Sequence, residues 1–194
     1  MIRNHSADII IGIDANNGYD LAGTKRLFEH IGELDIAFAE EMFPETVDED
    51  LDFKAFLKDN GWKTLVADGE TQSGIDVFKP FMQAKAIDVY QGDMNRFGFE
   101  GILTEAGWAD DQGLMVAPHN WGSLVGFYMQ LQVGRAIPNF YRAEHDPLSS
   151  DVLVADGYAI DDGVADVPDA PGAGLAIDEA RFASEATIRF DVSL

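Results

Sequence analysis

The chain has 194 residues, of which 46% are hydrophobic, so a substantial buried core is expected and intrinsic disorder is not. Its 35 acidic and 13 basic residues give a formal net charge of −22, which argues against nucleic acid and anionic membrane surfaces as partners. Cysteine is absent, which excludes disulfides and thiolate chemistry, and no run of about 18 apolar residues suggests a membrane span. Because the start also lacks the pattern of a secretion signal, a cytoplasmic protein is predicted.

Apolar, β-branched segments alternate with amphipathic segments from residue 8 to residue 143. The pattern predicts strands over 8–14, 35–40, 63–67, 86–91, 114–117 and 138–143. Helices are predicted between them, over 20–31, 48–61, 72–84, 99–112 and 121–134, with Pro80 awkward inside the third. A strand and a helix that recur roughly every 25 residues build parallel βαβ units, so an α/β fold is expected.

The composition changes after Pro147, where Gly, Asp and Pro become frequent and predict hairpins and turns that close the fold. We therefore expect a single domain over 1–194, with βα units in 8–146 and a return segment in 147–194. Six βα units do not close an eight-stranded barrel. The chain is then either an open doubly wound sheet or the later part of a barrel, and the start at Met1, just before a strong strand, favours the barrel.

Each predicted strand ends in a carboxylate or a histidine. These groups, in chain order, are Asp14, Glu40, Glu70, Asp93, His119 and Glu144. Parallel strands place all their C-terminal ends on one edge of the sheet, so the six side chains are expected to converge there. This pattern is typical of a metal-dependent enzyme.

The first three groups, Asp14, Glu40 and Glu70, are carboxylates on successive strands, and oxygen ligands favour Mg²⁺ or Mn²⁺ over zinc. Three close like charges would raise one another's pKa unless a cation were bound among them. Taken singly, each acid has an ordinary alternative, such as capping a turn or pairing with a lysine.

His119 follows an apolar strand, and Asp93 ends the strand before it, so the carboxylate could orient the imidazole as a general base or acid. A histidine that only bonds a loop carbonyl is the alternative. Within the cluster Glu144-His145-Asp146, Glu144 is the predicted site residue because it lies nearest the strand end.

The order of these groups resembles the enolase superfamily, in particular its mandelate racemase-like branch. The segments IDANNGYD, FAEEMFPE, ADGE, QGDMNRFG and APHNWGS are similar to the successive strand-end motifs of that branch, and PGAGLAIDE is similar to its return segment. The family fold is a (β/α)₇β barrel with an N-terminal α+β capping domain. The resemblance therefore implies a partial barrel of about six βα units, strands 3–8, without that domain.

The resemblance also implies roles for the strand-end residues. Mg²⁺, with Mn²⁺ as the alternative, would be bound by Asp14, Glu40 and Glu70. Asp93 and His119 would form the catalytic dyad. Glu144 would hydrogen-bond the substrate carboxylate or the enediolate oxygen, and Asn16 would lie beside the site as a substrate-binding residue.

The implied reaction is Mg²⁺-dependent removal of the proton alpha to a carboxylate, through a stabilised enediolate. The family's lysine pair has no counterpart, since Lys63, Lys79 and Lys85 fall at strand starts or on a helix. A two-base racemase would lack its second base, so dehydration of an acid sugar (an aldonate or aldarate) by a carbon–oxygen lyase is predicted first. A racemase or epimerase and an inactive fragment are the alternatives. The open strand edges would be covered by a homo-oligomer or by a missing N-terminal portion.

Overall fold

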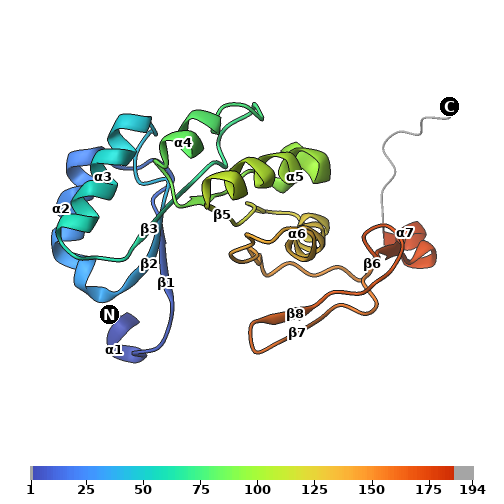
Figure 1. Cartoon of the computed structure of the whole chain (residues 1–194). Helices are drawn as coiled ribbons and strands as arrows, with labels where there is room; N and C mark the ends of the chain where they lie inside the picture. Colours follow the sequence, from blue (N-terminus) through green and yellow to red (C-terminus); the bar gives the residue numbers. More distant parts are fainter. Residues whose placement is uncertain (1, 186–194) are drawn as a thin grey trace.

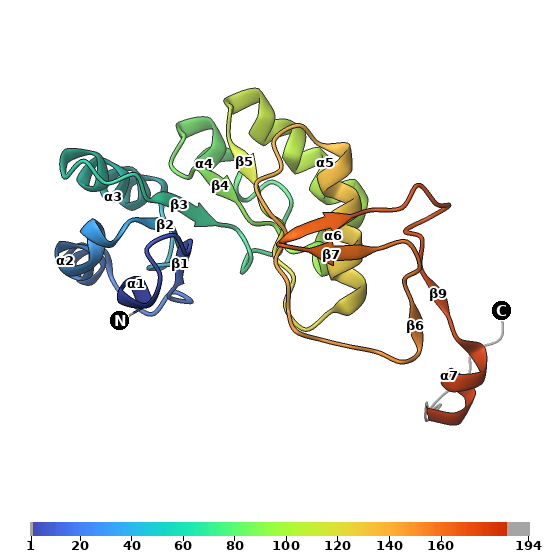
Figure 2. The same cartoon turned by 90° about the horizontal axis from the view of Figure 1, so that it is seen from below.

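The computed structural model describes residues 2–185, which form a parallel sheet flanked by helices and followed by an irregular C-terminal segment (Figures 1 and 2). Five strands lie side by side in chain order, and every neighbouring pair is parallel. They are β1 (Ile11–Asp14), β2 (Ile36–Glu40), β3 (Leu65–Asp68), β4 (Val89–Tyr90) and β5 (Met115–Val116). The predicted succession of parallel βα units is therefore confirmed.

The connecting helices follow one side of the sheet (Figure 1). They are α2 (Leu21–Ile31), α3 (Val47–Asp59), α4 (Lys79–Ala84), α5 (Met94–Gln112) and α6 (Leu124–Ala136). Short side chains begin them: the N-cap Asp20 accepts the N–H of Gly23 at 2.6 Å, and Ser123 accepts the N–H of Gly126 at 2.9 Å. A short helix α1 (Ile2–His5) precedes β1, and a 3₁₀ turn η1 (Gly32–Leu34) leads into β2.

Two apolar clusters cover the two faces of the sheet. The larger cluster packs the helices onto the sheet and includes Phe28, Phe53 and Phe78, all with at most 1% of their surface exposed. The smaller one, on the opposite face, is formed by small residues such as Ala67 and Ala117, with Phe38 and Tyr141 packed against them. Because it lies on the face turned away from the helices, this cluster corresponds to the interior of a barrel.

Several predicted elements differ from the structure: the helix expected over 99–112 begins at Met94, and the strand expected over 86–91 is only Val89–Tyr90. Two others differ more. The helix expected over 72–84 spans only Lys79–Ala84, because Pro80 has no N–H to donate and is tolerated only in the first turn of a helix. The strand expected over 138–143 is reduced to one bridge between Val116 and Phe140. Two hydrogen bonds with Val116 hold that segment beside β5, one to the carbonyl of Asn139 at 2.9 Å and one from the N–H of Tyr141 at 2.7 Å.

The C-terminal segment contains one hairpin and one pair of strands that are distant in the sequence. In the distant pair, strand β6 (Leu153–Val154) pairs with β9 (Ala176–Ile177), and in the hairpin β7 (Ala159–Asp161) pairs with β8 (Val164–Asp166), both antiparallel. Helix α7 (Glu179–Glu185) follows, and the last part of the predicted return segment, 186–194, lies outside the described residues. Among the helices of residues 2–185, none is long and apolar enough to cross a membrane.

Asp50 is a carboxylate buried in the first turn of α3, with 2% of its surface exposed. Burial raises its pKa to about 7, and the carboxylates of Glu45 and Glu49 add to the shift. A helix N-terminus favours a carboxylate by only about 0.3–1 kcal/mol, whereas three pKa units correspond to about 4 kcal/mol, so burial dominates.

This shift predicts that stability falls as the pH rises from about 4 to about 7, because the native state keeps a proton that the unfolded chain loses. The side chain in Asp50→Asn cannot ionise. At pH 8 we therefore expect its free energy of unfolding, measured by urea denaturation, to exceed that of wild type by about 2 kcal/mol, and near pH 4 we expect the two to be equal. Asp48→Asn, at an exposed position of the same turn, is the control and should bring no such gain. An equal gain in both variants would contradict the assignment to burial.

Candidate metal and proton-transfer site

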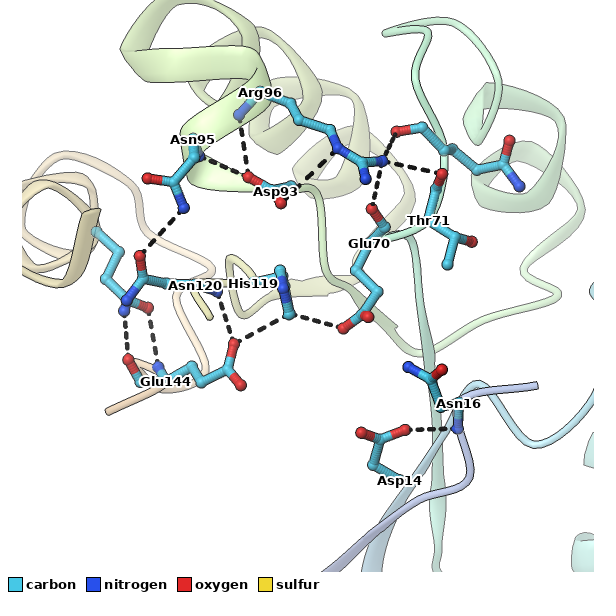
Figure 3. Close-up of polar contacts among 12 residues, drawn as sticks. Asp14, Asn16, Glu70, Thr71, Asp93, Asn95, Arg96, His119, Asn120 and Glu144 are labelled. Carbon is cyan, nitrogen blue, oxygen red and sulfur yellow. Dashed lines mark hydrogen bonds and ion pairs between the residues drawn. The ribbon is translucent and has the colours of Figure 1, made fainter. Parts of the chain in front are cut away.

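The C-terminal edge of the sheet gathers the predicted site residues (Figure 3). Asp14 ends β1 and lies in register with Glu40, the last residue of β2. Glu70 follows β3, and His119 lies three residues beyond the end of β5. Each group therefore arrives on its own βα unit, as the sequence predicts.

Glu40, Glu70 and His119 form the tightest polar cluster. Each offers a ligand atom within 4.8 Å of the others, and among the described residues no other acidic or histidine group of three does so. The imidazole Nδ1 of His119 lies 2.6 Å from Oε2 of Glu70 and 3.1 Å from Oε2 of Glu144. These are ion-pair contacts, because the ring N–H points at neither oxygen squarely enough to form a hydrogen bond.

Two members of the cluster, Glu40 and His119, have raised pKa values, for different reasons. Burial raises the pKa of Glu40 to about 8, and a hydrogen bond with Gln91 opposes that shift. Further rise comes from the nearby carboxylates of Asp14, Glu70 and Glu144. Burial alone would lower the pKa of His119, but the contacts with Glu144 and Glu70 outweigh it and raise the pKa to about 10. His119 is therefore protonated at neutral pH in this arrangement.

The donor set fits a divalent cation. Glu40 is 8% exposed, so its negative charge lies in a poorly solvated place where other carboxylates oppose it. A bound cation would remove that cost, and carboxylate oxygens are the ligands that Mg²⁺ and Mn²⁺ prefer. Glu41, the neighbour of Glu40 in sequence, lies apart from the cluster and is buried with both carboxylate oxygens unpartnered within the described part of the chain.

Asp14 and Asn16 lie on the far side of Glu70 from His119 (Figure 3). Oδ1 of Asp14 accepts the main-chain N–H of Asn16 at 2.8 Å, which holds the carboxylate in a local turn. Its oxygens are not within the cluster that Glu40 and Glu70 form with His119. Both residues are exposed at this edge of the sheet, so their predicted roles as metal ligand and substrate contact stay predictions.

The main chain of Asp93 lies beside that of His119, and the two residues form a parallel β-bridge. Its carboxylate, however, caps α5: Oδ1 accepts the N–H groups of Asn95 at 2.6 Å and Arg96 at 3.0 Å. In residues 2–185 the carboxylates that contact the imidazole are those of Glu70 and Glu144. The pairing of Asp93 with His119 in a catalytic dyad stays a prediction.

Glu144 is held by residues that sequence reasoning missed. Its Oε2 accepts the main-chain N–H of Asn120 at 2.6 Å. The side-chain amide of Gln130, fully buried on α6, accepts the N–H of Glu144 at 2.9 Å and donates to its carbonyl oxygen. Burial would raise the pKa of Glu144, but the contact with His119 and the hydrogen bond from the Asn120 N–H outweigh it and lower the pKa. The only signal in the sequence for this arrangement was a glutamine, Gln130, within a largely apolar helical segment.

A pocket of about 140 Å³ opens between the strand ends. Its floor is the apolar face of Phe38, Ala67, Val89, Ala117 and Tyr141, and its rim includes Glu40, Gln91 and Glu144. An apolar floor beneath a few converging polar groups is the usual form of a small-molecule site.

The family can be assigned from a match over most of the chain, because the enolase C-terminal domain-like family matches residues 1–181. This chain belongs to the enolase C-terminal domain-like family. The predicted membership of the enolase superfamily and the predicted partial α/β barrel are thereby confirmed.

Relatives in this family include enzymes of acid-sugar metabolism. The chain is 31% identical over 183 residues to D-galactarolactone cycloisomerase of Agrobacterium fabrum, across 88% of this chain and 47% of that protein. The structure of galacturonate dehydratase from Geobacillus sp., complexed with D-galacturonate and 5-keto-4-deoxy-D-galacturonate, superposes with a TM-score of 0.84 at 30% identity, across 92% of this chain and 48% of that one. A mutant of the Geobacillus enzyme complexed with Mg superposes with a TM-score of 0.81 at 30% identity, across 90% and 46%. The chain spans about half the length of each of these relatives.

Proposed function

We propose that this chain carries the metal-binding and proton-transfer part of an acid-sugar dehydratase, a carbon–oxygen lyase. The observation that carries the proposal is the cluster of Glu40, Glu70 and His119 at one edge of a parallel sheet, with Glu144 also in contact with the imidazole. The likeness to galacturonate dehydratase supports the substrate class, a small sugar acid.

Glu40 and Glu70 would hold Mg²⁺, or Mn²⁺ in its place, with Asp14 as the predicted third carboxylate. When bound, the cation supplies positive charge where negative charge develops on the substrate carboxylate. The polar side chains that line the pocket (Glu40, Gln91, Arg142 and Glu144) and its apolar floor leave room for a small molecule between them.

His119 would move the protons. In this arrangement it is held protonated by Glu70 and Glu144, with a pKa raised to about 10 against the opposing effect of burial. If Glu70 held a cation, the imidazolium would lose one partner, the pKa of His119 would fall, and the neutral ring could accept a proton.

The proton that His119 accepts comes from the carbon next to the substrate carboxylate. When His119 returns it to the hydroxyl on the following carbon, that hydroxyl leaves as water. The C–H and C–O bonds break and a double bond forms between the two carbons, so the electron count balances. Glu144 and Asn16 are the proposed substrate contacts, and Asp93 the proposed partner of His119.

The test is incubation of the purified chain with Mg²⁺ and a pool of aldonic and aldaric acids in D₂O, followed by mass spectrometry. We expect deuterium at the α-carbon of one or more acids, dependent on Mg²⁺, and a product that has lost one water. The double variant Asp93→Asn, His119→Asn is the control and should show neither.

The alternatives give different products in the same experiment. A racemase or epimerase would incorporate deuterium with inversion and without loss of water. The absence of both exchange and loss of water, with a folded chain, would contradict an activity of this chain and leave an inactive fragment. The cytoplasmic location and the homo-oligomer expected from the sequence stay predictions.

A further inference from the structure

The turn that carries Glu70 is tied to the next βα unit by one arginine (Figure 3). Nη1 of Arg96, in the first turn of α5, donates to the carbonyl oxygens of Glu70 at 3.0 Å, Thr71 at 2.9 Å and Gln72 at 3.1 Å. In residues 2–185 no other hydrogen bond reaches these three carbonyl oxygens. Arg96 therefore satisfies all three main-chain carbonyls of the turn, which is also tied through its side chains by the hydrogen bond from Gln72 to Glu45.

Arg96 is itself fixed from the neighbouring strand end. Its main-chain N–H donates to Oδ1 of Asp93 at 3.0 Å, and its Nε lies 3.9 Å from Oδ2 of the same carboxylate. One residue thus connects the end of β4 with the turn after β3. Glu70 leaves that turn toward His119, where the two side chains meet at 2.6 Å.

The contribution of Arg96 to stability should be small. Its side chain is 48% exposed and Thr71 is exposed as well, so water can replace the lost hydrogen bonds. The effect on the orientation of Glu70 should be larger, because mutation of a residue that orients a metal ligand commonly changes metal affinity by about 10–100-fold.

We propose that Arg96 is a positioning residue for Glu70, which holds the 70–72 turn so that the Glu70 carboxylate stays within reach of Glu40 and His119. The proposal rests on the proposed function only in taking Glu70 as a metal ligand.

The experiment compares Arg96→Gln with wild type, each as the whole 194-residue chain, by Mn²⁺ titration followed by electron paramagnetic resonance and by competition with Mg²⁺. We expect Arg96→Gln to bind Mn²⁺ about 10–100-fold more weakly, with a melting temperature within about 3 °C of wild type. Arg96→Lys, which keeps the charge and one donor, should retain part of the affinity.

The sign of the change separates positioning from bulk charge. Removal of a cation beside an acidic cluster would, by charge alone, strengthen Mn²⁺ binding. Unchanged or tighter binding by Arg96→Gln would therefore overturn the proposal.

Arg135→Gln is the matched control. Arg135 on α6 also donates from Nη1 to main-chain carbonyls, those of Val167 at 3.3 Å and Pro168 at 3.0 Å, away from the cluster. We expect it to bind Mn²⁺ as wild type does, and an equal weakening in both variants would overturn the positioning role.

A metal-free measurement keeps this proposal distinct from the proposed function. The ring ¹⁵N resonances of His119 at fixed pH report its contact with Glu70, and should move in Arg96→Gln but not in Arg135→Gln. If wild type binds no Mn²⁺, the metal-binding role is contradicted, while an unmoved His119 resonance in Arg96→Gln would overturn the positioning of Glu70.

Discussion

Glu70→Gln is expected to weaken Mg²⁺ binding by at least about 100-fold while the chain stays folded. The substitution keeps the shape of the side chain and removes the charge that one of the two clustered carboxylates offers a cation. The negative charge of Glu70 also repels that of Glu40 and raises its pKa, so neutralising Glu70 should stabilise the folded chain. The loss of the contact between Glu70 and His119 opposes this stabilisation, because the imidazolium keeps only Glu144 as a partner.

Isothermal titration with Mg²⁺ at pH 8 and a thermal melt in EDTA would measure the two effects separately. Glu29→Gln is the control, because the same substitution at an exposed position of α2 changes the net charge equally. We expect it to bind Mg²⁺ as wild type does. Wild-type affinity in Glu70→Gln would place the cation elsewhere, for example at Asp14, and would remove the basis of the proposed metal site.

His119→Asn is expected to lower Mg²⁺-dependent exchange of the α-proton by about 10²–10⁴-fold, the usual contribution of a general acid or base. Metal affinity should remain, because Glu40 and Glu70 are both kept. The variant also removes an imidazolium that competes with a cation for the Glu70 carboxylate, so slightly tighter binding is expected. The combination of lost exchange with retained binding is the signature of a proton-transfer residue.

Deuterium incorporation in D₂O and Mg²⁺ titration of the same preparation would measure both quantities. His145→Asn is the control, since His145 is exposed and its ring packs at a tilt against Phe127, with the ring centroids 4.6 Å apart. We expect it to exchange at the wild-type rate. Exchange that survives in His119→Asn would assign the proton transfer to another group.

Much of the fold could be predicted from the sequence because local and long-range signals agree. The apolar runs that end at Asp14 and Glu40 became β1 and β2, and Asp20 begins α2 as its N-cap. Pro80 shows where the signals conflict: the amphipathic pattern before it suggested a longer helix, and the missing N–H ended that possibility.

The candidate site was predictable as a set of strand ends but not as a set of contacts. Strand direction fixes which side chains reach the edge, whereas rotamers and short turns decide which of them meet. Asp14 is held by the N–H of Asn16, and Asp93 by the start of α5, both through local hydrogen bonds that compete with long-range partners. Arg96 gave no signal at all, because its three acceptors lie 24 to 26 residues away and are main-chain atoms.

The strands follow one another in the sheet in the same order as in the chain, and this has a consequence for how such a site can be inherited. All the predicted polar groups fall in one uninterrupted stretch, from Asp14 to Glu144. A gene-exchange event with both breakpoints outside that stretch would move the whole set of groups into a new protein at once. A breakpoint between Glu40 and His119 would separate these two groups, and each product would have to rebuild the missing half from unrelated sequence.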